Sequence, residues 1–250
     1  MKFRRRLLPA ERSLPCDIVH FARQVPVARA EAELDLGEVA AARSQADPRI
    51  SWTALFVKGQ GMVAERHAWL RQTFLRWPIP HVYDHAQSTA MVAVQREYQG
   101  RPRLCFGRLI DPAHRSLVDL QQHLDHYAHG PVEEVFRKQL RLSRMPWPVR
   151  RMAWWVTLNI AGPTRARQVG TFSLSSLAGQ GVNNRDHPTL CTSSLSYGPL
   201  DSAGRALVTL IYDHRLADGR QASDVLHELH QTLLSSLLAE LHQLRRAQAA

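Results

Sequence analysis

The chain has few cysteines and no long apolar run. Its three cysteines, Cys16, Cys105 and Cys191, stand far apart and form no C-x-x-C motif. An odd number of scattered cysteines argues against a disulfide framework and favours a reducing compartment, so we expect a cytoplasmic protein. The longest apolar run, residues 152–161, is about half the length of a bilayer-spanning helix. The basic stretch at residues 1–8 lacks the apolar core of a signal peptide. We therefore expect neither a transmembrane segment nor a secretory leader.

Motifs for binding nucleic acids are also lacking, although the formal net charge is +10. The sequence contains no helix-turn-helix, zinc-finger or RNP pattern, and its basic residues are dispersed apart from a cluster at residues 2–6. Charge alone supports only non-specific attraction to a polyanion. The sequence therefore does not predict a nucleic-acid partner.

Histidines are plentiful, but their spacing is only a weak indication of a metal site. His123, His126 and His129 are spaced by three, and His227 and His230 repeat that spacing. Imidazoles three residues apart on a helix can share a metal ion. No obvious carboxylate or cysteine completes either set, so the sequence does not favour a metal cofactor.

The patterning predicts one α/β domain over residues 1–250, in which residues 1–12 form a flexible basic N-terminus. A composition of 44% hydrophobic and 22% charged residues is typical of a soluble globular protein. We find no internal repeat and no low-complexity linker. The sequence pattern predicts strands at residues 27–36, 89–97 and 104–110, a buried strand from the continuous apolar run at residues 207–212, and helices at residues 17–25, 52–76, 117–126 and 222–244.

Residues 207–219, LVTLIYDHRLADG, join a buried strand to a long amphipathic helix through a polar turn. The turn presents His214, and an imidazole with an ordinary pKa of ~6.5 is well suited to moving protons near neutrality. His214 has a structural alternative as a hydrogen-bonded histidine at a strand end. Asp218, followed three residues later by Gln221, fits a helix capping box. The pattern alone leaves the catalytic and structural interpretations open.

Two segments resemble one known family. The motif D-H-R-x-x-D-G at residues 213–219 resembles the active-site signature of the dihydrolipoamide acyltransferase catalytic domains of 2-oxoacid dehydrogenase complexes. Chloramphenicol acetyltransferase, which shares their fold, carries a related H-H-x-x-x-D-G. Residues 170–179, GTFSLSSLAG, are similar to the G-T-F-T-I-S-N-L-G stretch of the same acyltransferases, and weaker similarity extends over residues 25–244. The resemblance implies a chloramphenicol-acetyltransferase-like α/β fold, a two-layer sandwich of a mixed β-sheet covered by helices.

The resemblance also assigns expected roles in acyl transfer. His214 matches the general base, and Ser175 matches the serine that donates a hydrogen bond to the oxyanion. Asp218 matches the family's aspartate, which supports the loop and the orientation of the histidine, and Arg215 matches a structural arginine. If the predicted strand is read one residue out of register, Ser176 is the alternative donor.

The implied function is a free-standing acyltransferase that uses coenzyme A or acyl-coenzyme A as co-substrate, with a thiol, alcohol or amine acceptor and no metal. The implied assembly is a homotrimer with active sites between subunits. Three features depart from the family pattern: Ser176 replaces an asparagine, Ala178 replaces a glycine, and the connection from Ser175 to His214 is shorter. We expect no lipoyl domain before the catalytic segment, so a core acyltransferase of a dehydrogenase complex would receive its lipoyl groups in trans. A non-catalytic scaffold that kept the fold is the third alternative.

Residues 136–155, FRKQLRLSRMPWPVRRMAWW, have no counterpart in the resemblance. One interpretation is a helical hairpin broken at Pro146 and Pro148, with arginine stems over apolar surface. An oligomer interface would use the same mixture of aromatic residues and arginine. The functional alternative is an acyl-chain or lipid-facing entrance beside the active site. We favour packing or an interface, because such stripes are most often core.

Overall fold

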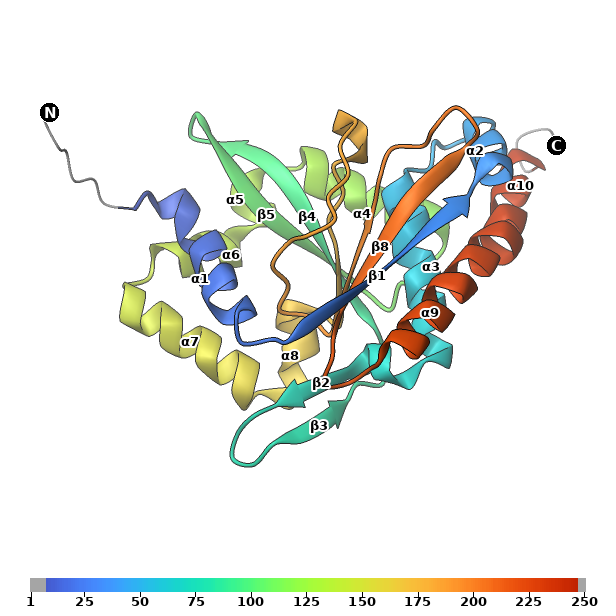
Figure 1. The fold of residues 1–250 in the computed structure, drawn as a ribbon. Helices are drawn as coiled ribbons and strands as arrows, with labels where there is room; N and C mark the ends of the chain where they lie inside the picture. Colours follow the sequence, from blue (N-terminus) through green and yellow to red (C-terminus); the bar gives the residue numbers. More distant parts are fainter. Residues whose placement is uncertain (1–7, 247–250) are drawn as a thin grey trace, which may run out of the picture.

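A mixed six-stranded sheet forms the centre of the protein, as the computed structural model shows for residues 8–246 (Figure 1). The strand order is β1-β8-β7-β6-β4-β5. The strands are β1 (Val27–Asp35), β4 (Thr89–Tyr98), β5 (Arg101–Ile110), β6 (Phe172–Leu174), β7 (Ser193–Tyr197) and β8 (Arg205–Asp213). β6 runs parallel to both of its neighbours, whereas all other neighbouring pairs are antiparallel. The predicted mixed sheet is confirmed.

Helices occupy most of the remaining described chain. They are α1 (Ser13–Ala22), α2 (Gly37–Ser44), α3 (Trp52–Arg66), α4 (Leu117–His129), α5 (Val132–Val135), α6 (Arg137–Arg144), α7 (Trp147–Asn159), α8 (Gly162–Val169), α9 (Gly219–Thr232) and α10 (Leu238–Arg246). A π-helical turn, Leu233–Leu237, joins α9 to α10. Within residues 8–246, no helix has both the length and the apolar character of a membrane span.

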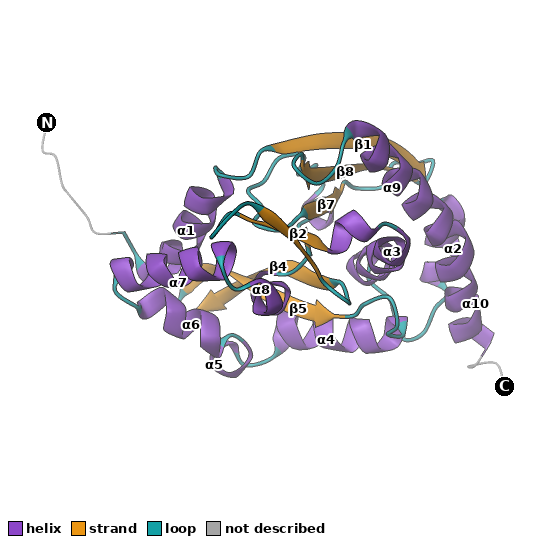
Figure 2. Cartoon of the chain, turned by 90° about the horizontal axis from the view of Figure 1, so that it is seen from below, coloured by secondary structure: helices purple, strands orange, loops and turns teal. Residues whose placement is uncertain are grey.

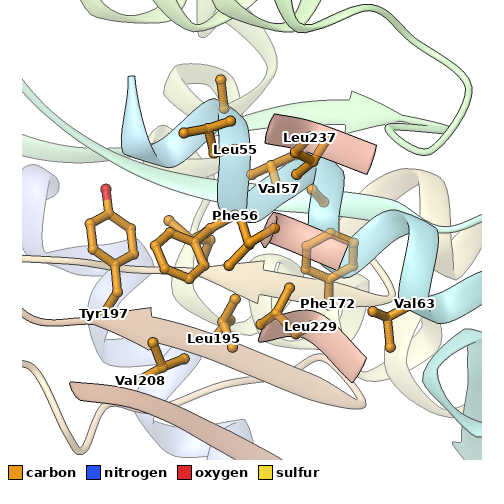
Figure 3. Packing of buried hydrophobic residues seen from close by; sticks show 14 of the residues in the cluster. Leu55, Phe56, Val57, Val63, Phe172, Leu195, Tyr197, Val208, Leu229 and Leu237 are labelled. Atoms are coloured by element: carbon orange, nitrogen blue, oxygen red, sulfur yellow. The ribbon is translucent and has the colours of Figure 1, made fainter. Parts of the chain in front are cut away.

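The main hydrophobic core lies between the first face of the sheet and helices α2, α3, α4, α9 and α10. Alternate strand residues supply the sheet side of this core, because successive side chains point to opposite faces. Phe172 and Leu195 contribute from β6 and β7, and Leu229 contributes from α9 (Figure 3). Phe56 of α3 stacks on Tyr197 of β7, with ring centroids 4.5 Å apart. The long amphipathic helix predicted after β8 therefore packs on this core.

The second face of the sheet is covered at one end by α1 and α7, which lie side by side (Figures 1 and 2). Phe21 of α1 and Leu158 of α7 share a smaller hydrophobic cluster with Met91 of β4. Asp17, only 1% exposed, joins the two helices through ion pairs with Arg150 and Arg151 of α7. One buried carboxylate therefore connects the N-terminal helix to a helix more than a hundred residues later.

The predicted helix at residues 52–76 is wrong in its second half. α3 ends at Arg66, because the next residue leaves the helical conformation (φ −111°, ψ 92°). β2 (Gln72–Leu75) then pairs with β3 (His81–Asp84) in an antiparallel hairpin. The apolar residues of this segment follow helical spacing in sequence, but the backbone groups of residues 72–75 are paired across the hairpin. The predicted break at Pro146 is confirmed, because α6 ends before that residue and α7 starts after it, whereas the break predicted at Pro148 is wrong, because Pro148 lies in the first turn of α7.

The predicted flexible N-terminus falls largely outside the described residues, because residues 1–7 are not described. Its last part, Ala10–Arg12, forms a short 3-10 helix that leads into α1. Strands predicted at residues 27–36, 89–97 and 104–110 correspond to β1, β4 and β5. The helix predicted at residues 17–25 is present but begins four residues earlier, at Ser13.

We predict that Asp17→Ala lowers the free energy of unfolding by about 3–5 kcal/mol, because removing one partner leaves a buried, uncompensated guanidinium. Urea denaturation followed by circular dichroism measures the change. Glu33→Ala is the matched control, since the ion pair between Glu33 and Arg205 is exposed and is worth at most ~1 kcal/mol. Equal losses in the two variants would contradict a structural role for the buried carboxylate.

Candidate active site

His214 lies in the turn that follows β8, and its side chain is exposed. The backbone N–H of His214 donates to the carbonyl oxygen of Pro26 at 2.9 Å. The residues on either side of it pair with each other: Arg215 donates to the carboxylate of Asp213 through Nε at 2.8 Å and through its terminal nitrogen at 2.6 Å. The Arg215 guanidinium also lies 4.1 Å from the ring centroid of Phe74. The ion pair between Asp213 and Arg215 and the contact of Arg215 with Phe74 fix the turn. The imidazole of His214 is directed away from the core.

Asp218 is the N-cap of α9. Its carboxylate accepts a hydrogen bond from the backbone N–H of Gln221 at 3.0 Å, and the Gln221 side chain accepts one from the backbone N–H of Asp218 at 3.0 Å. The predicted capping box is confirmed. Among residues 8–246, no hydrogen bond joins Asp218 to His214, so Asp218 acts on the turn through the start of α9.

Ser175 directly follows β6 and lies on the second face of the sheet, because Phe172 and Leu174 point into the main core. Its backbone N–H donates to the carbonyl oxygen of Leu195 at 3.1 Å. Its Oγ accepts a hydrogen bond from the side-chain amide of Asn184 at 3.1 Å. The hydroxyl proton of Ser175 therefore remains available for donation to another group.

Ser176 faces a different environment. Its Oγ donates to the carbonyl oxygen of Tyr197 at 2.7 Å and accepts from the backbone N–H of Ala178 at 3.1 Å. Its hydroxyl is therefore used inside the protein. The geometry favours Ser175 over Ser176 as the residue with a free donor.

The strand directions place Ser175 and His214 at opposite ends of the sheet. β6 and β8 flank β7, and β7 is parallel to β6 but antiparallel to β8. Through Leu195, Leu174 lies in register with Leu210. His214 is therefore about 16 Å from Ser175 along the strand direction and about 10 Å from it across the strands. One chain does not bring these two side chains into a common site.

A hydrogen-bonded polar network lies beside Ser175 on the same face. Ser173 donates to Ser194 at 2.6 Å and lies 3.1 Å from the hydroxyl of Thr189, while Nε2 of His187 lies 2.6 Å from the hydroxyl of Ser194. Burial lowers the pKa of His187 below its ordinary value of 6.5, although the nearby charge of Asp186 opposes the shift. The neutral imidazole is therefore the favoured form.

Sequence reasoning missed Asn184 and His187. Both lie in an irregular connection between β6 and β7, where neither periodicity nor a recognised motif marks them. The hydroxyl of Ser196 on β7 donates to the backbone carbonyl of Asn184 at 2.5 Å, which holds this loop against the sheet. Only the three-dimensional pairing of the loop with β7 reveals that Asn184 orients Ser175.

A large cavity of about 680 Å³ lies on the second face, between the sheet and α1, α6, α7 and α8. Ser173 forms part of its wall, together with Met91, Phe106 and Trp154. The segment at residues 136–155 forms the wall opposite the sheet through α6 and α7. The outer side of α7 is exposed: Trp147 and Met152 are 62% and 61% exposed. One side of this segment therefore lines the cavity, and the opposite side of α7 is exposed.

A second hollow, of about 550 Å³, lies near the start of α3 and beside Ala178. Arg43 and Arg49 line it, together with Trp52 and Asp125. Burial lowers the pKa of the Arg43 guanidinium, and the charge of Arg49 lowers it further. An anion bound between the two arginines would relieve their mutual repulsion.

The spaced histidines do not converge. Within residues 8–246, no group of three His, Cys, Asp or Glu side chains is arranged to hold a metal ion. His123 lies beside Arg115, with its Nδ1 2.9 Å from a guanidinium nitrogen, and Nε2 of His230 lies 2.8 Å from the carbonyl oxygen of Asp35. The three cysteines are free thiols, and burial raises the pKa of Cys191 to about 11.

Comparison with solved structures identifies the architecture. Dihydrolipoamide acetyltransferase from Azotobacter vinelandii matches with a TM-score of 0.65 at 14% identity, over 95% of this chain and 94% of that chain. A probable dihydrolipoamide acetyltransferase from Listeria monocytogenes matches with a TM-score of 0.64 at 12% identity, over 97% and 95% of the two chains. The chain has the fold of a dihydrolipoamide acyltransferase catalytic core.

A truncated catalytic core of the 2-oxoacid dehydrogenase complex from Thermoplasma acidophilum has the same fold, with a TM-score of 0.64 at 14% identity over 93% of this chain and 99% of that chain. No protein-family model and no curated relative matches the sequence. The acyltransferase-core fold confirms the predicted α/β class and the resemblance that led to it. At these identities the likeness concerns the fold alone.

We predict that His187 makes the protein less stable in acid. Because burial holds its folded-state pKa below 6.5, the unfolded chain binds a proton more readily, and folding stability falls as the pH drops below about 6.5. His187→Gln should show a shallower loss of unfolding free energy between pH 7 and pH 5, measured by urea denaturation at each pH. At pH 8 the imidazole is neutral in the folded and in the unfolded state. The free energies of unfolding of the wild type and of His187→Gln should therefore change equally with pH there. An equal loss of unfolding free energy between pH 7 and pH 5 in the two proteins would contradict the proposed role of His187 in acid sensitivity.

Proposed function

We propose that the protein is a coenzyme A-dependent acyltransferase whose active site combines His214 of one subunit with Ser175 of the next. The observation that carries this proposal is the pair of free functional groups in an acyltransferase-core fold: an exposed imidazole at the end of β8 and a serine hydroxyl oriented by Asn184 at the end of β6. Their separation within one chain accounts for the need for a second subunit.

In the proposed reaction, the imidazole of His214 removes the proton from the thiol, hydroxyl or amine of the acceptor. The acceptor then attacks the thioester carbonyl and forms a tetrahedral intermediate. The hydroxyl of Ser175 donates a hydrogen bond to the oxyanion as its charge develops. Collapse of the intermediate breaks the carbon–sulfur bond, and the departing thiolate of coenzyme A takes the proton back from the imidazolium.

Asn184 has a positioning role in this proposal. Its amide donates to one of the two lone pairs of Ser175 Oγ, which orients the hydroxyl and leaves its proton available for donation to a new partner. Successive hydrogen bonds polarise one another, which strengthens the donor at the end of the chain. A hydrogen bond from the Ser175 hydroxyl is stronger to a charged oxygen than to a neutral carbonyl, so it stabilises the oxyanion more than the ground state.

The Azotobacter enzyme supports this choice of residues. Its catalytic mechanism has been investigated at a serine, a histidine and an asparagine four positions after the histidine. His214 and Asp218 have the same spacing, although this chain carries aspartate at the second position. Both side chains can cap a helix. The substitution is therefore compatible with a role for Asp218 in holding the turn.

A structural neighbour also supports trimeric assembly as part of this proposal. One structural neighbour is the cubic core of a pyruvate dehydrogenase complex, which matches with a TM-score of 0.62 at 14% identity. A closed cyclic arrangement repeats each interface, so every Ser175 would meet a His214 from a neighbour.

The hollow at Arg43 and Arg49 lies beside Ala178, close to the Ser175 loop. Its cations suit the phosphates of coenzyme A.

The acceptor distinguishes this proposal from its closest competitor. An acceptor screen with acyl-coenzyme A donors should include dihydrolipoamide, because the neighbours include dihydrolipoamide acetyltransferases. Preferred transfer to dihydrolipoamide would indicate a core of a dehydrogenase complex supplied with lipoyl groups in trans. Preferred transfer to another thiol, an alcohol or an amine would indicate a free-standing enzyme. No transfer to any acceptor would favour a scaffold.

We expect His214→Ala to lower kcat by ~10²–10⁴-fold through loss of the general base. Ser175→Ala should lower kcat by ~10²-fold or somewhat more with little change in KM, because its hydrogen bond forms only in the transition state. Steady-state kinetics with the best acyl donor measure both effects. Ser176→Ala is the matched control, since its hydroxyl bonds to the backbone. Near-normal turnover in a folded His214→Ala protein would exclude the proposed base.

A shared site predicts complementation between two inactive variants. His214→Ala and Ser175→Ala proteins, unfolded together and refolded in equal amounts, should recover about one quarter of wild-type activity, because random trimers unite an intact histidine with an intact serine at ~1/4 of interfaces. Each variant refolded alone provides the baseline. Absence of recovery in mixtures that native mass spectrometry shows to contain mixed trimers would mean that the site lies within one chain.

A further inference from the structure

The large cavity on the second face of the sheet has the size of a ligand site. Its volume of about 680 Å³ falls within the range of roughly 300–1,000 Å³ that is usual for small-molecule pockets. β4, β5 and β6 form its floor, and α1, α6 and α7 form its roof. It is separate from the hollow lined by Arg43 and Arg49.

The lining of this cavity is predominantly apolar. Its lining includes the hydrophobic side chains of Leu14, Ile18, Met91, Phe106, Phe136, Leu142, Trp154 and Leu190. Arg137, Lys138 and Arg141 contribute from the exposed side of α6. Long basic side chains lay their methylene stems against apolar surface and keep their charges in water. Glu134 provides a carboxylate at the same rim.

Most neutral polar groups in the wall already have partners within the protein. Gln139 makes hydrogen bonds with both backbone groups of Phe106, and Thr157 donates to Gln168 at 2.9 Å. The hydroxyls of Ser173 and Thr189 belong to the network described above. The buried indole N–H of Trp154 has no hydrogen-bond partner among the described residues. These walls suit a hydrocarbon chain better than a polar molecule, because a polar ligand would lose its hydration and find few free partners.

The cavity lies close to the proposed oxyanion site, although Ser175 itself is not among its lining residues. Ser173 lines the cavity, and Ser175 follows two residues later on the same face of the chain. Two residues of extended strand span about 7 Å. A thioester whose carbonyl oxygen lies at Ser175 could therefore extend its acyl chain directly under α7.

We propose that this cavity is an acyl-chain pocket and that the preferred donors are thioesters of medium- and long-chain fatty acids. This inference rests on the proposed function, in which Ser175 binds the oxyanion of the same acyl group. It gives the inner side of the segment at residues 136–155 the role of a pocket wall. Acyl length would then be selected by the room under α7, between Ala153 and the sheet.

Binding can be tested without turnover. Calorimetric titration of the whole protein with acetyl-, hexanoyl-, decanoyl- and dodecanoyl-coenzyme A, with no acceptor present, should show affinity rising up to about fourfold per methylene until the pocket is full. Ala153→Phe and Thr157→Phe add a ring to the cavity lining and should flatten this rise. The matched controls, Met152→Phe and Val156→Phe, change adjacent exposed residues on the outer side of α7 and should retain it. Circular dichroism verifies that all four variants are folded.

A flat dependence on chain length in the wild-type protein would overturn the acyl-chain pocket. A rise that survives in both Ala153→Phe and Thr157→Phe would also overturn it, because the chain would then bind elsewhere, such as on the exposed face of α7. Repeating the titration with His214→Ala separates the two proposals. A chain-length dependence in that protein, combined with absence of transfer by the wild type, would reject the enzyme but retain the pocket. Transfer with no chain-length dependence in binding would reject only the pocket.

Discussion

The opposite directions of β6 and β8 are the constraint on which the arrangement of functional groups depends. Each strand delivers a polar residue just beyond its carboxyl end, so antiparallel strands deliver Ser175 and His214 to opposite ends of the sheet. No rotation of a side chain spans that distance, because a serine hydroxyl lies only a few ångströms from its own backbone. A site that uses both groups therefore requires two chains, so the sheet topology makes the proposed catalysis depend on the proposed assembly.

The two proposed catalytic groups are held in different ways. His214 sits on a turn closed by an ion pair between the residues before and after it, so the local backbone is rigid while the imidazole stays exposed. Ser175 is positioned by a loop residue, Asn184, whose own backbone is tied to β7. The base is thus supported by its own turn, whereas the oxyanion donor depends on a connection that arrives from later in the chain. Substitutions in that connection can alter Ser175 without touching the strand that carries it.

Much of the fold could be predicted from the sequence, because hydrophobic alternation and helix caps are local signals. β1 and β4 followed from period-two patterning, β8 followed from an uninterrupted apolar run, and the capping box at Asp218 followed from two residues three positions apart. The end of α3 could not be predicted, since residues 72–75 become a strand only by pairing with residues 81–84. Asn184 and the cavity were also beyond reach. Both arise where distant segments meet, and no local pattern reports such a meeting.

The pairing of β1 with β8 has a consequence for the order in which the protein is made. Val27 pairs with Asp213, so β1 leaves the ribosome long before β8 and waits for its partner strand. At ~5–20 residues per second, that wait lasts roughly 10–40 s. During it, β1 is an unpaired strand open to wrong partners. Its alternating charges, at Arg29, Glu31 and Glu33, discourage such pairing. The edge strand thus carries protection that matters most before the sheet is complete.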